Sequence, residues 1–330
     1  MTRPDRIIKM ASAFYDSCVL FTASDLGIFT TLDKKGEADA ATLAAALGLD
    51  PRGTRLLLDA CVALDLLGKD GNSYFNTPES ATFLVEGSPA NLGGAIRYNR
   101  DVYSAWGELE KLVQTGAPVE KPETHLGDDS ERTRAFVLSM HYRALGIGQA
   151  VVPLLDLGDC KKLLDIGGGP GTYSRLIAKR FPDIHCTVVD LPEVVKIAAE
   201  LTEAEGMADR VATIPGDYRT TAFPGGCDVV IFFGVLHQES PDSILSLFQK
   251  AHAALNDGGK IYVMDMMTDP THTKPSFSAL FAVNMALTTE NGWVFSDSEL
   301  QQWLSQAGFT DFKVQPLPTP MPHWLASAVK

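Results

Sequence analysis

Hydrophobic and polar residues follow two different patterns along this chain. As far as about Ser88 the apolar residues recur mostly at helical spacing. From Lys161 onward, short apolar runs typical of buried strands alternate with helical segments. The two patterns predict a mainly helical first part followed by an α/β part.

The first part is predicted to contain a winged helix. The segments TLAAALGLD and PRGTRLLLDACVALDLL predict two helices joined by a tight turn, and GKDGNSYFNT predicts a short hairpin. Asp70-Gly71 in that hairpin is a dipeptide that suits a primed turn.

Winged helices often bind DNA, but the charges of this chain argue against that function. The second predicted helix and its borders carry two cations, Arg52 and Arg55, and three acids, Asp50, Asp59 and Asp65. The formal net charge of the chain is −13, whereas binding to a duplex requires clustered Lys and Arg side chains. A small-molecule ligand is therefore favoured over nucleic acid.

The apolar run from Phe14 to Phe29 has no obvious partner within so small a domain. We therefore expect a helix there that is buried against a second subunit in a homodimer.

Between residues 89 and 157 the pattern is again helical, and we expect connector helices that also cover the active site. The predicted division is a dimerisation domain at 1–100, connector helices at 101–157 and an α/β domain at 158–330.

The second part predicts a Rossmann-like domain, with a parallel sheet and helices on both faces. KKLLDIGGG is a buried strand that enters a glycine loop, TYSRLIAKRF is a helix, and HCTVVDLP is a second strand. The next strands are RVATIPGD, CDVVIFFGV and GKIYVMDMM, and FKVQPLP and HWLASAVK close the sheet.

The glycine loop predicts a nucleotide-like cofactor. Glycines let the backbone turn sharply and approach a ligand closely, and the next helix offers free amides at its N-terminus. After Gly167, Gly169 and Gly171 comes Thr172, where dinucleotide folds require Gly or Ala. Nicotinamide is therefore the weaker interpretation.

Two acids extend this motif. Asp190 ends the next strand about twenty residues after the loop, where a carboxylate can accept hydrogen bonds from ribose hydroxyls. Asp217 follows the third strand, within reach of an adenine.

In order and spacing, the runs LLDIGGGPGTYS, VVDLPEVV, PGDY and GVLHQE resemble the bacterial and plant O-methyltransferases of the caffeate, hydroxyindole and phenazine or anthracycline type. The likeness covers nearly the whole chain, because that family also begins with a winged-helix dimerisation domain. The resemblance implies S-adenosylmethionine as cofactor. It implies that Asp165 and Gly167, Gly168 and Gly169 face the methionine portion, Asp190 and Leu191 the ribose, and Asp217 and Tyr218 the adenine.

His237 is the candidate general base. Methyl transfer requires alignment of a nucleophile with the methyl group, and a phenol or enol needs a base of near-neutral pKa. His237 follows the fourth strand, at the carboxyl edge of the sheet where α/β ligands bind. In the resembling family the catalytic His stands here and is followed by Asp and an aromatic residue, whereas this chain has Gln238 and Glu239.

The resemblance also implies acids that flank the base. Asp265 occupies the position of the first acid, but the second falls near Val294, so His237 keeps one acidic partner at most. Glu239 is either a substitute partner or a surface residue. The alternative role of His237 is to position the substrate.

A flat, apolar acceptor is expected, because the segments that form the pocket in that family carry aromatic and Met side chains here. These residues are equally compatible with simple core packing. They are Phe136, Met140, Phe277, Phe281 and Met285.

Composition agrees with this picture. Hydrophobic residues make up 45% of the 330 residues, no apolar run approaches the length of a membrane span, and the charged N-terminus lacks a signal-peptide pattern. We expect a cytoplasmic protein that does not bind membranes. The five cysteines are scattered singly, and no metal site is predicted.

The main hypothesis is an O-methyltransferase that acts on a small phenolic or enolic compound. The second keeps the cofactor but methylates carbon or nitrogen, which the altered His-Gln-Glu run supports. A nicotinamide oxidoreductase and a DNA-binding regulator are the weaker alternatives.

Overall fold

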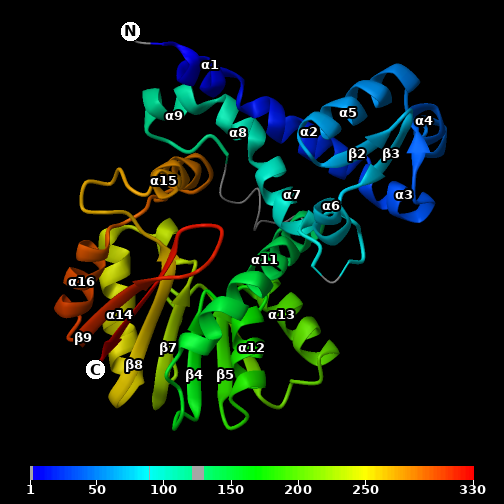
Figure 1. Ribbon diagram of the computed structural model, residues 1–330. Helices are drawn as coiled ribbons and strands as arrows, with labels where there is room; N and C mark the ends of the chain where they lie inside the picture. Colours follow the sequence, from blue (N-terminus) through cyan, green and yellow to red (C-terminus); the bar gives the residue numbers. More distant parts are fainter. Residues whose placement is uncertain (1–2, 89, 121–129) are drawn as a thin grey trace. The chain divides into compact units, whose positions relative to one another are not determined.

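The computed structural model describes residues 3–88, 90–120 and 130–330. The chain divides into two compact units, Met1–Arg100 and Asp101–Lys330 (Figure 1). Each unit has a hydrophobic core of its own.

The first unit contains the predicted winged helix. Aspartates begin both helices of the pair: the Asp39 carboxylate accepts from the Thr42 amide and the Asp50 carboxylate from the Gly53 amide. The described elements of this unit are α1 (Asp5–Ser12), α2 (Phe14–Asp25), α3 (Ile28–Lys35), β1 (Ala38–Asp39), α4 (Ala40–Leu47), α5 (Pro51–Ala63), β2 (Leu67–Asp70), β3 (Ser73–Asn76), α6 (Pro78–Phe83) and α7 (Gly93–Asp101).

The turn of the hairpin lies one residue later than the sequence prediction. Asp70 pairs with Ser73 across β2 and β3, so the two central turn residues are Gly71 and Asn72. Gly71 has a φ of 56°, which a glycine adopts at little cost. The hairpin also gains a short third strand, because β1 pairs with β3.

The apolar run of the first unit forms two helices instead of one. Gly27, with a φ of 68°, ends the first and begins the second. Ile28 and Phe29 are buried in the core of their own unit, so this end of the run has an intrachain partner after all. Phe14 and Tyr15 at the other end remain 49% and 60% exposed.

The second unit is built on a seven-stranded sheet with the order β6-β5-β4-β7-β8-β10-β9. All strand pairs are parallel except those of β10, which runs antiparallel to β8 and β9. The elements are α8 (Tyr103–Gly107), α9 (Leu109–Thr115), α11 (Ser130–Val151), η1 (Val152–Leu154), β4 (Lys162–Ile166), α12 (Thr172–Arg180), β5 (His185–Asp190), α13 (Pro192–Ala204), β6 (Val211–Pro215), β7 (Cys227–Phe233), η2 (Leu236–Gln238), α14 (Pro241–Ala254), β8 (Leu255–Met266), α15 (Ser276–Thr288), α16 (Asp297–Gln306), β9 (Thr310–Pro316) and β10 (His323–Val329). The Rossmann-like alternation predicted from Lys161 onward is thereby confirmed.

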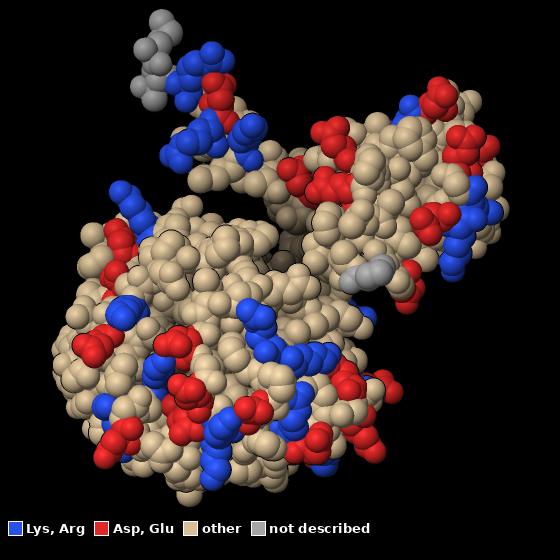
Figure 2. Space-filling view, turned by 60° about the horizontal axis from the view of Figure 1, so that its bottom comes forward, with Lys and Arg blue, Asp and Glu red and all other residues tan. Residues whose placement is uncertain are grey.

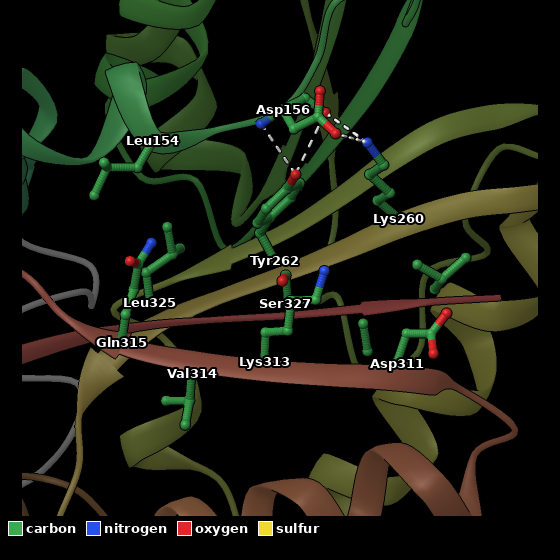
Figure 3. Close-up of a pocket in the computed structure, with 12 residues that line it drawn as sticks. Leu154, Asp156, Lys260, Tyr262, Asp311, Lys313, Val314, Gln315, Leu325 and Ser327 are labelled. Atoms are coloured by element: carbon green, nitrogen blue, oxygen red, sulfur yellow. Dashed lines mark hydrogen bonds and ion pairs between the residues drawn. The ribbon is translucent and has the colours of Figure 1, made fainter.

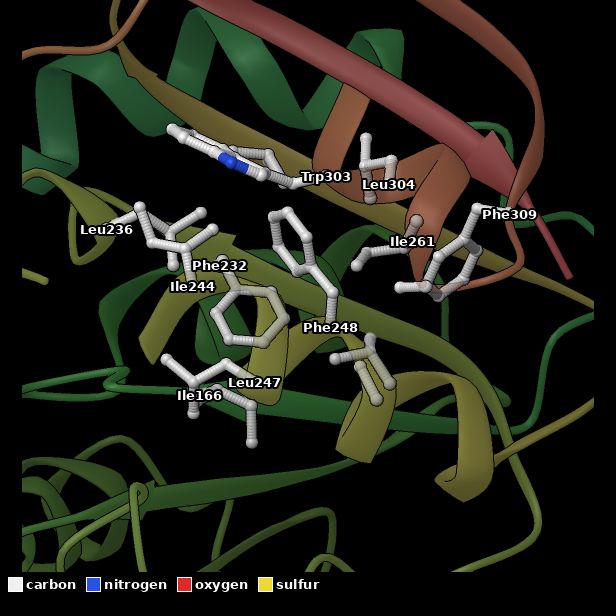
Figure 4. Close-up of a cluster of buried hydrophobic side chains, with 14 of the residues drawn as sticks. Ile166, Phe232, Leu236, Ile244, Leu247, Phe248, Ile261, Trp303, Leu304 and Phe309 are labelled. Carbon is white, nitrogen blue, oxygen red and sulfur yellow. The ribbon is translucent and has the colours of Figure 1, made fainter. Parts of the chain in front are cut away.

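Helices cover both faces of the sheet. On one face α14 and α16 pack onto the central strands, where Phe232 and Phe248 meet edge to face with ring centroids 5.6 Å apart (Figure 4). On the other face α11 and α12 form the second core, with Tyr173 against Phe233. This packing holds the strands in place. The loops at the carboxyl ends of the strands therefore begin from fixed positions.

Charged residues of both signs are interspersed on the face of the α/β unit that Figure 2 shows, with no broad basic area there. Within the described ranges, no helix combines the length and the apolar character needed to cross a membrane.

Candidate active site

The glycine loop follows β4 and has a backbone that only glycine adopts easily. Gly167, Gly169 and Gly171 have φ values of 64°, 54° and 67°. Gly168 is required for a different reason: a Cβ atom there would lie 2.6 Å from Cγ of Asp165. The loop therefore closes over the Asp165 carboxyl group and leaves no room for a side chain at Gly168.

Asp165 is fully buried beneath this loop. Its Oδ2 accepts a hydrogen bond of 2.7 Å from the Ser174 hydroxyl, while Oδ1 has no hydrogen-bond partner in the described part of the chain. Burial raises the pKa of Asp165 to about 7. A buried carboxyl oxygen without a partner fits a site that a polar group of a ligand completes.

Asp190 connects the end of β5 to the same loop. Its Oδ2 accepts from the Gly169 amide and its Oδ1 from the Leu191 amide, both at 2.7 Å. Burial raises the pKa of Asp190 to about 6. The predicted ribose acid and the predicted glycine loop are therefore in direct contact.

Asp217 and Tyr218 differ in their surroundings. Asp217 is partly exposed and forms a salt bridge with Arg219 at 2.9 Å, which lowers the pKa of Asp217. The Tyr218 ring is buried, and its Cε1 lies 3.4 Å from where a Gly167 Cβ would stand. Tyr218 therefore lies beside the glycine loop, whereas Asp217 has its charge balanced by a neighbour.

His237 and Asp265 form a hydrogen-bonded pair. His237 lies in the short turn η2 after β7, and Asp265 lies near the end of β8, which pairs with β7. The distance from Nδ1 of His237 to Oδ1 of Asp265 is 2.8 Å, and the His237 amide also approaches Oδ2 at 3.3 Å. An ionised carboxylate only accepts hydrogen bonds, so Nδ1 carries the proton and Nε2 has a free lone pair.

The position of the second predicted acid is apolar in the structure as well. Val294 is buried, and its neighbour Trp293 donates from its amide to the His237 carbonyl at 2.9 Å. Glu239 does not replace the acid: its side chain is buried and accepts from the hydroxyls of Tyr218 and Ser243. It is therefore not a surface residue either.

The five candidate acceptor residues fall into two groups. Phe277, Phe281 and Met285 are spaced four residues apart on α15, and their side chains run from 46% exposed at Phe277 to buried at Met285. The Phe281 ring meets the His237 ring edge to face, with centroids 5.2 Å apart. Phe136 and Met140 lie on α11, where Phe136 packs near Leu191 and α13.

One polar cluster near the loop was missed by the sequence analysis. Arg175 is almost fully buried and donates to the carbonyl of Pro170, to Glu205 at 3.1 Å and to Nδ1 of His141 at 3.3 Å. The same nitrogen of His141 lies 2.8 Å from the Thr172 hydroxyl. An arginine one turn into a helix looks like any surface residue in sequence, so no pattern identifies this cluster.

A hollow of about 350 Å³ lies elsewhere in the second unit (Figure 3). It is lined by residues of β8, β9 and β10 and by Leu154 and Asp156, and it includes none of the predicted site residues. Tyr262 borders it, and its hydroxyl accepts from the Asp156 amide at 3.1 Å.

Among the described residues, no group of three or more His, Cys, Asp or Glu side chains could hold a metal ion.

A mainly parallel sheet of this order, with a glycine loop after β4 and an acid at the end of β5, is typical of a Rossmann-like class I methyltransferase. A family model described as O-methyltransferase domain matches residues 116–310, more than half of the chain, and one described as O-methyltransferase dimerisation domain matches residues 8–86. The chain therefore belongs to the O-methyltransferase family.

Similar proteins include an O-methyltransferase and an N,N-dimethyltransferase. The tetracenomycin polyketide synthesis 8-O-methyl transferase TcmO of Streptomyces glaucescens is 31% identical, over 94% of this chain and 92% of TcmO. The N,N-dimethyltransferase OxyT of Streptomyces rimosus is 29% identical, over 98% of this chain and 96% of OxyT. The structure of human N-acetylserotonin methyltransferase in complex with S-adenosylmethionine superposes with a TM-score of 0.89 at 28% identity, covering 100% of this chain and 98% of that protein.

The protein is an S-adenosylmethionine-dependent O-methyltransferase, and the carbon or nitrogen alternative is not favoured. The residues present fit that cofactor: the loop backbone leaves space for a ligand at Gly169, and Asp190 stands beside it.

Proposed function

We propose that this enzyme methylates a hydroxyl group of a small aromatic compound, with His237 as general base. The observation that supports this role is the 2.8 Å contact between Nδ1 of His237 and Asp265. It fixes the tautomer in which Nε2 can take a proton, and buried Asp265 stabilises the imidazolium that forms. We propose Asp265 as the partner that orients the base.

We further propose that the cofactor lies along the glycine loop. When bound, S-adenosylmethionine supplies a methyl group on a positively charged sulfur, which is displaced in line by the acceptor oxygen. Gly167, Gly168 and Gly169, with Asp165 beneath them, are assigned to the methionine portion, and the open space at Gly169 supports this placement. Asp190 and Leu191 are assigned to the ribose, and Asp217 and Tyr218 to the adenine side.

The acceptor is proposed to lie against the α15 face that carries Phe277, Phe281 and Met285, with Phe136 and Met140 on α11 contributing a further wall. Phe281 already touches the ring of His237, so an aromatic acceptor held against it would have its hydroxyl near the base. We keep the division into 1–100, 101–157 and 158–330 as a working description of the chain.

We propose that the protein is a homodimer assembled through its first unit. Support comes from the dimerisation-domain match and from the apolar side chains that α1 and α2 expose, each of them 49% to 67% accessible. These residues are Ile7, Ile8, Met10, Phe14 and Tyr15. Sedimentation is expected to give a dimer, and a stable monomer at micromolar concentration would contradict the assembly.

Two substitutions test the role of the hydrogen-bonded pair of His237 and Asp265. His237→Ala and Asp265→Asn are each expected to lower the turnover of a phenolic acceptor by roughly 100-fold or more, while calorimetry shows unchanged affinity for S-adenosylmethionine. His185→Ala is the matched control, because His185 is exposed at the start of β5. Turnover of His237→Ala equal to that of the control would refute the proposed role.

A further inference from the structure

Glu239 is a buried acid that the proposed chemistry does not use. It follows His237 and Gln238 in a run where the family has Asp and an aromatic residue. Only 4% of Glu239 is exposed. Its Oε1 accepts a 2.7 Å hydrogen bond from the Tyr218 hydroxyl, and its Oε2 accepts from the Ser243 hydroxyl.

Tyr218 is held by two consecutive residues of this run. Its hydroxyl donates to Glu239 and accepts from Nε2 of Gln238 at 2.9 Å. Burial raises the pKa of the Tyr218 phenol well above its usual range, so the hydroxyl keeps its proton and remains a donor. With both hydrogen-bonding directions of the hydroxyl occupied, the ring has one orientation, and in that orientation it lies against Gly167.

The same run is fixed from the other side by Trp293. The indole Nε1 of Trp293 donates to the Glu239 carbonyl at 2.8 Å, and its amide donates to the His237 carbonyl at 2.9 Å. One short turn therefore presents the candidate base on one side and holds Tyr218 on the other.

We infer that Glu239 is a positioning residue for cofactor binding: it holds the Tyr218 ring as a fixed wall beside the glycine loop. It is not a second acid for His237, because both of its carboxylate oxygens are engaged by hydroxyls and the imidazole is held by Asp265. Removing the carboxylate therefore affects the affinity for the cofactor and leaves proton transfer intact. The inference rests on the proposed places of Gly167 and Tyr218 in the cofactor site.

The first test replaces Glu239 and measures the affinity for S-adenosylhomocysteine by calorimetry. Glu239→Leu keeps the approximate volume but leaves the Tyr218 hydroxyl without its acceptor, so Kd is expected to rise about tenfold. Glu239→Gln keeps an acceptor oxygen and is expected to restore Kd to within about threefold of the wild type. With saturating cofactor, both variants should keep the pH-rate profile of the wild type.

The second test measures coupling between the two side chains. Glu239→Leu leaves the Tyr218 hydroxyl without its acceptor, and Tyr218→Phe removes that hydroxyl. The variant that combines both changes is therefore expected to bind S-adenosylhomocysteine more tightly than Glu239→Leu alone. Tyr262→Phe is the control, because it removes another buried tyrosine hydroxyl from the opposite face of the same sheet. The control should leave Kd unchanged whatever it does to the melting temperature.

Two results would overturn the inference. If Glu239→Leu and Tyr218→Phe lower the melting temperature while Kd stays at the wild-type value, Glu239 serves stability alone. If Glu239→Leu instead lowers kcat and shifts the pH-rate profile at unchanged Kd, it assists the base. Failure of the proposed base is a separate result, since it appears in His237→Ala while Glu239→Leu still weakens the binding of the cofactor.

Discussion

The glycine loop and the α15 face are held in place by different kinds of interaction. The loop is fixed by its backbone: Gly168 leaves space only for the Asp165 carboxyl, and the Gly169 amide donates to Asp190 at 2.7 Å. The α15 face consists of apolar side chains, of which Phe281 reaches His237 through a ring contact. In the proposed assignment, cofactor binding therefore depends on backbone geometry, which tolerates little change, whereas acceptor binding depends on side-chain shape, which changes gradually.

The difference between the glycine loop and the α15 face is tested most strongly by adding one carbon atom to the loop. In Gly168→Ala the new Cβ would lie 2.6 Å from Cγ of the buried Asp165 side chain, so the loop or that side chain must shift. We expect the affinity for S-adenosylmethionine to fall by about 100-fold, measured by calorimetry.

Gly225→Ala is the control for that change, because a Cβ there meets no atom within 4 Å. Equal affinity in Gly168→Ala and Gly225→Ala would show that the tight fit of the loop does not matter for binding.

A smaller effect is expected on the acceptor side. Phe281→Ala removes the ring that packs against His237, so the KM for an aromatic acceptor should rise about tenfold. The Kd for S-adenosylmethionine should not change, because the loop is untouched. Leu280→Ala, on the same helix and 57% exposed, is the control. An equal change in KM for both variants would argue against binding of the acceptor to the α15 face.

An effect of similar size concerns the cofactor side and depends on pH. Burial raises the pKa of Asp190 to about 6, and hydrogen bonds donated by a ribose favour the ionised carboxylate. Affinity for S-adenosylmethionine should therefore be full above pH 7 and fall as pH drops through about 6, by roughly tenfold at pH 5.

Asp165, whose pKa is raised to about 7, titrates in a neighbouring range, so Asp190→Asn separates the two acids. In that variant the part of the pH dependence centred near 6 should disappear. A curve identical to that of the wild type would assign the dependence to another group.

The sequence predicted the backbone-determined part of the molecule well. The strand–helix alternation, the glycine loop and the position of Asp190 at a strand end follow from local signals, namely short apolar runs, glycines and a strand-end acid. The errors arose where a choice depends on three-dimensional packing. The helix from Phe14 was expected to continue to Phe29, but Gly27 takes a left-handed conformation and turns Ile28 into the core.

Side-chain networks were the least predictable part. Asp217 pairs with Arg219, and Glu239 is buried beside two hydroxyls, although these charged residues look solvent-exposed in sequence. Nothing in the spacing of residues 217–219 or 237–239 indicates which oxygen meets which hydroxyl. The contact between Glu239 and Tyr218 depends on the relative positions of two loops, which the sheet sets.

The role of His237 as general base is tested most directly by pH-rate profiles of the wild type and His237→Ala on one phenolic acceptor at saturating cofactor. Burial lowers the pKa of the nearby His323 to about 4, so that residue does not titrate in the range used. The proposed mechanism predicts a defect of roughly 100- to 10,000-fold near neutral pH that shrinks as pH rises, because an acceptor ionised by solvent no longer needs the imidazole. A constant offset between the two profiles at every pH would contradict the mechanism and leave His237 as a residue that only positions the substrate.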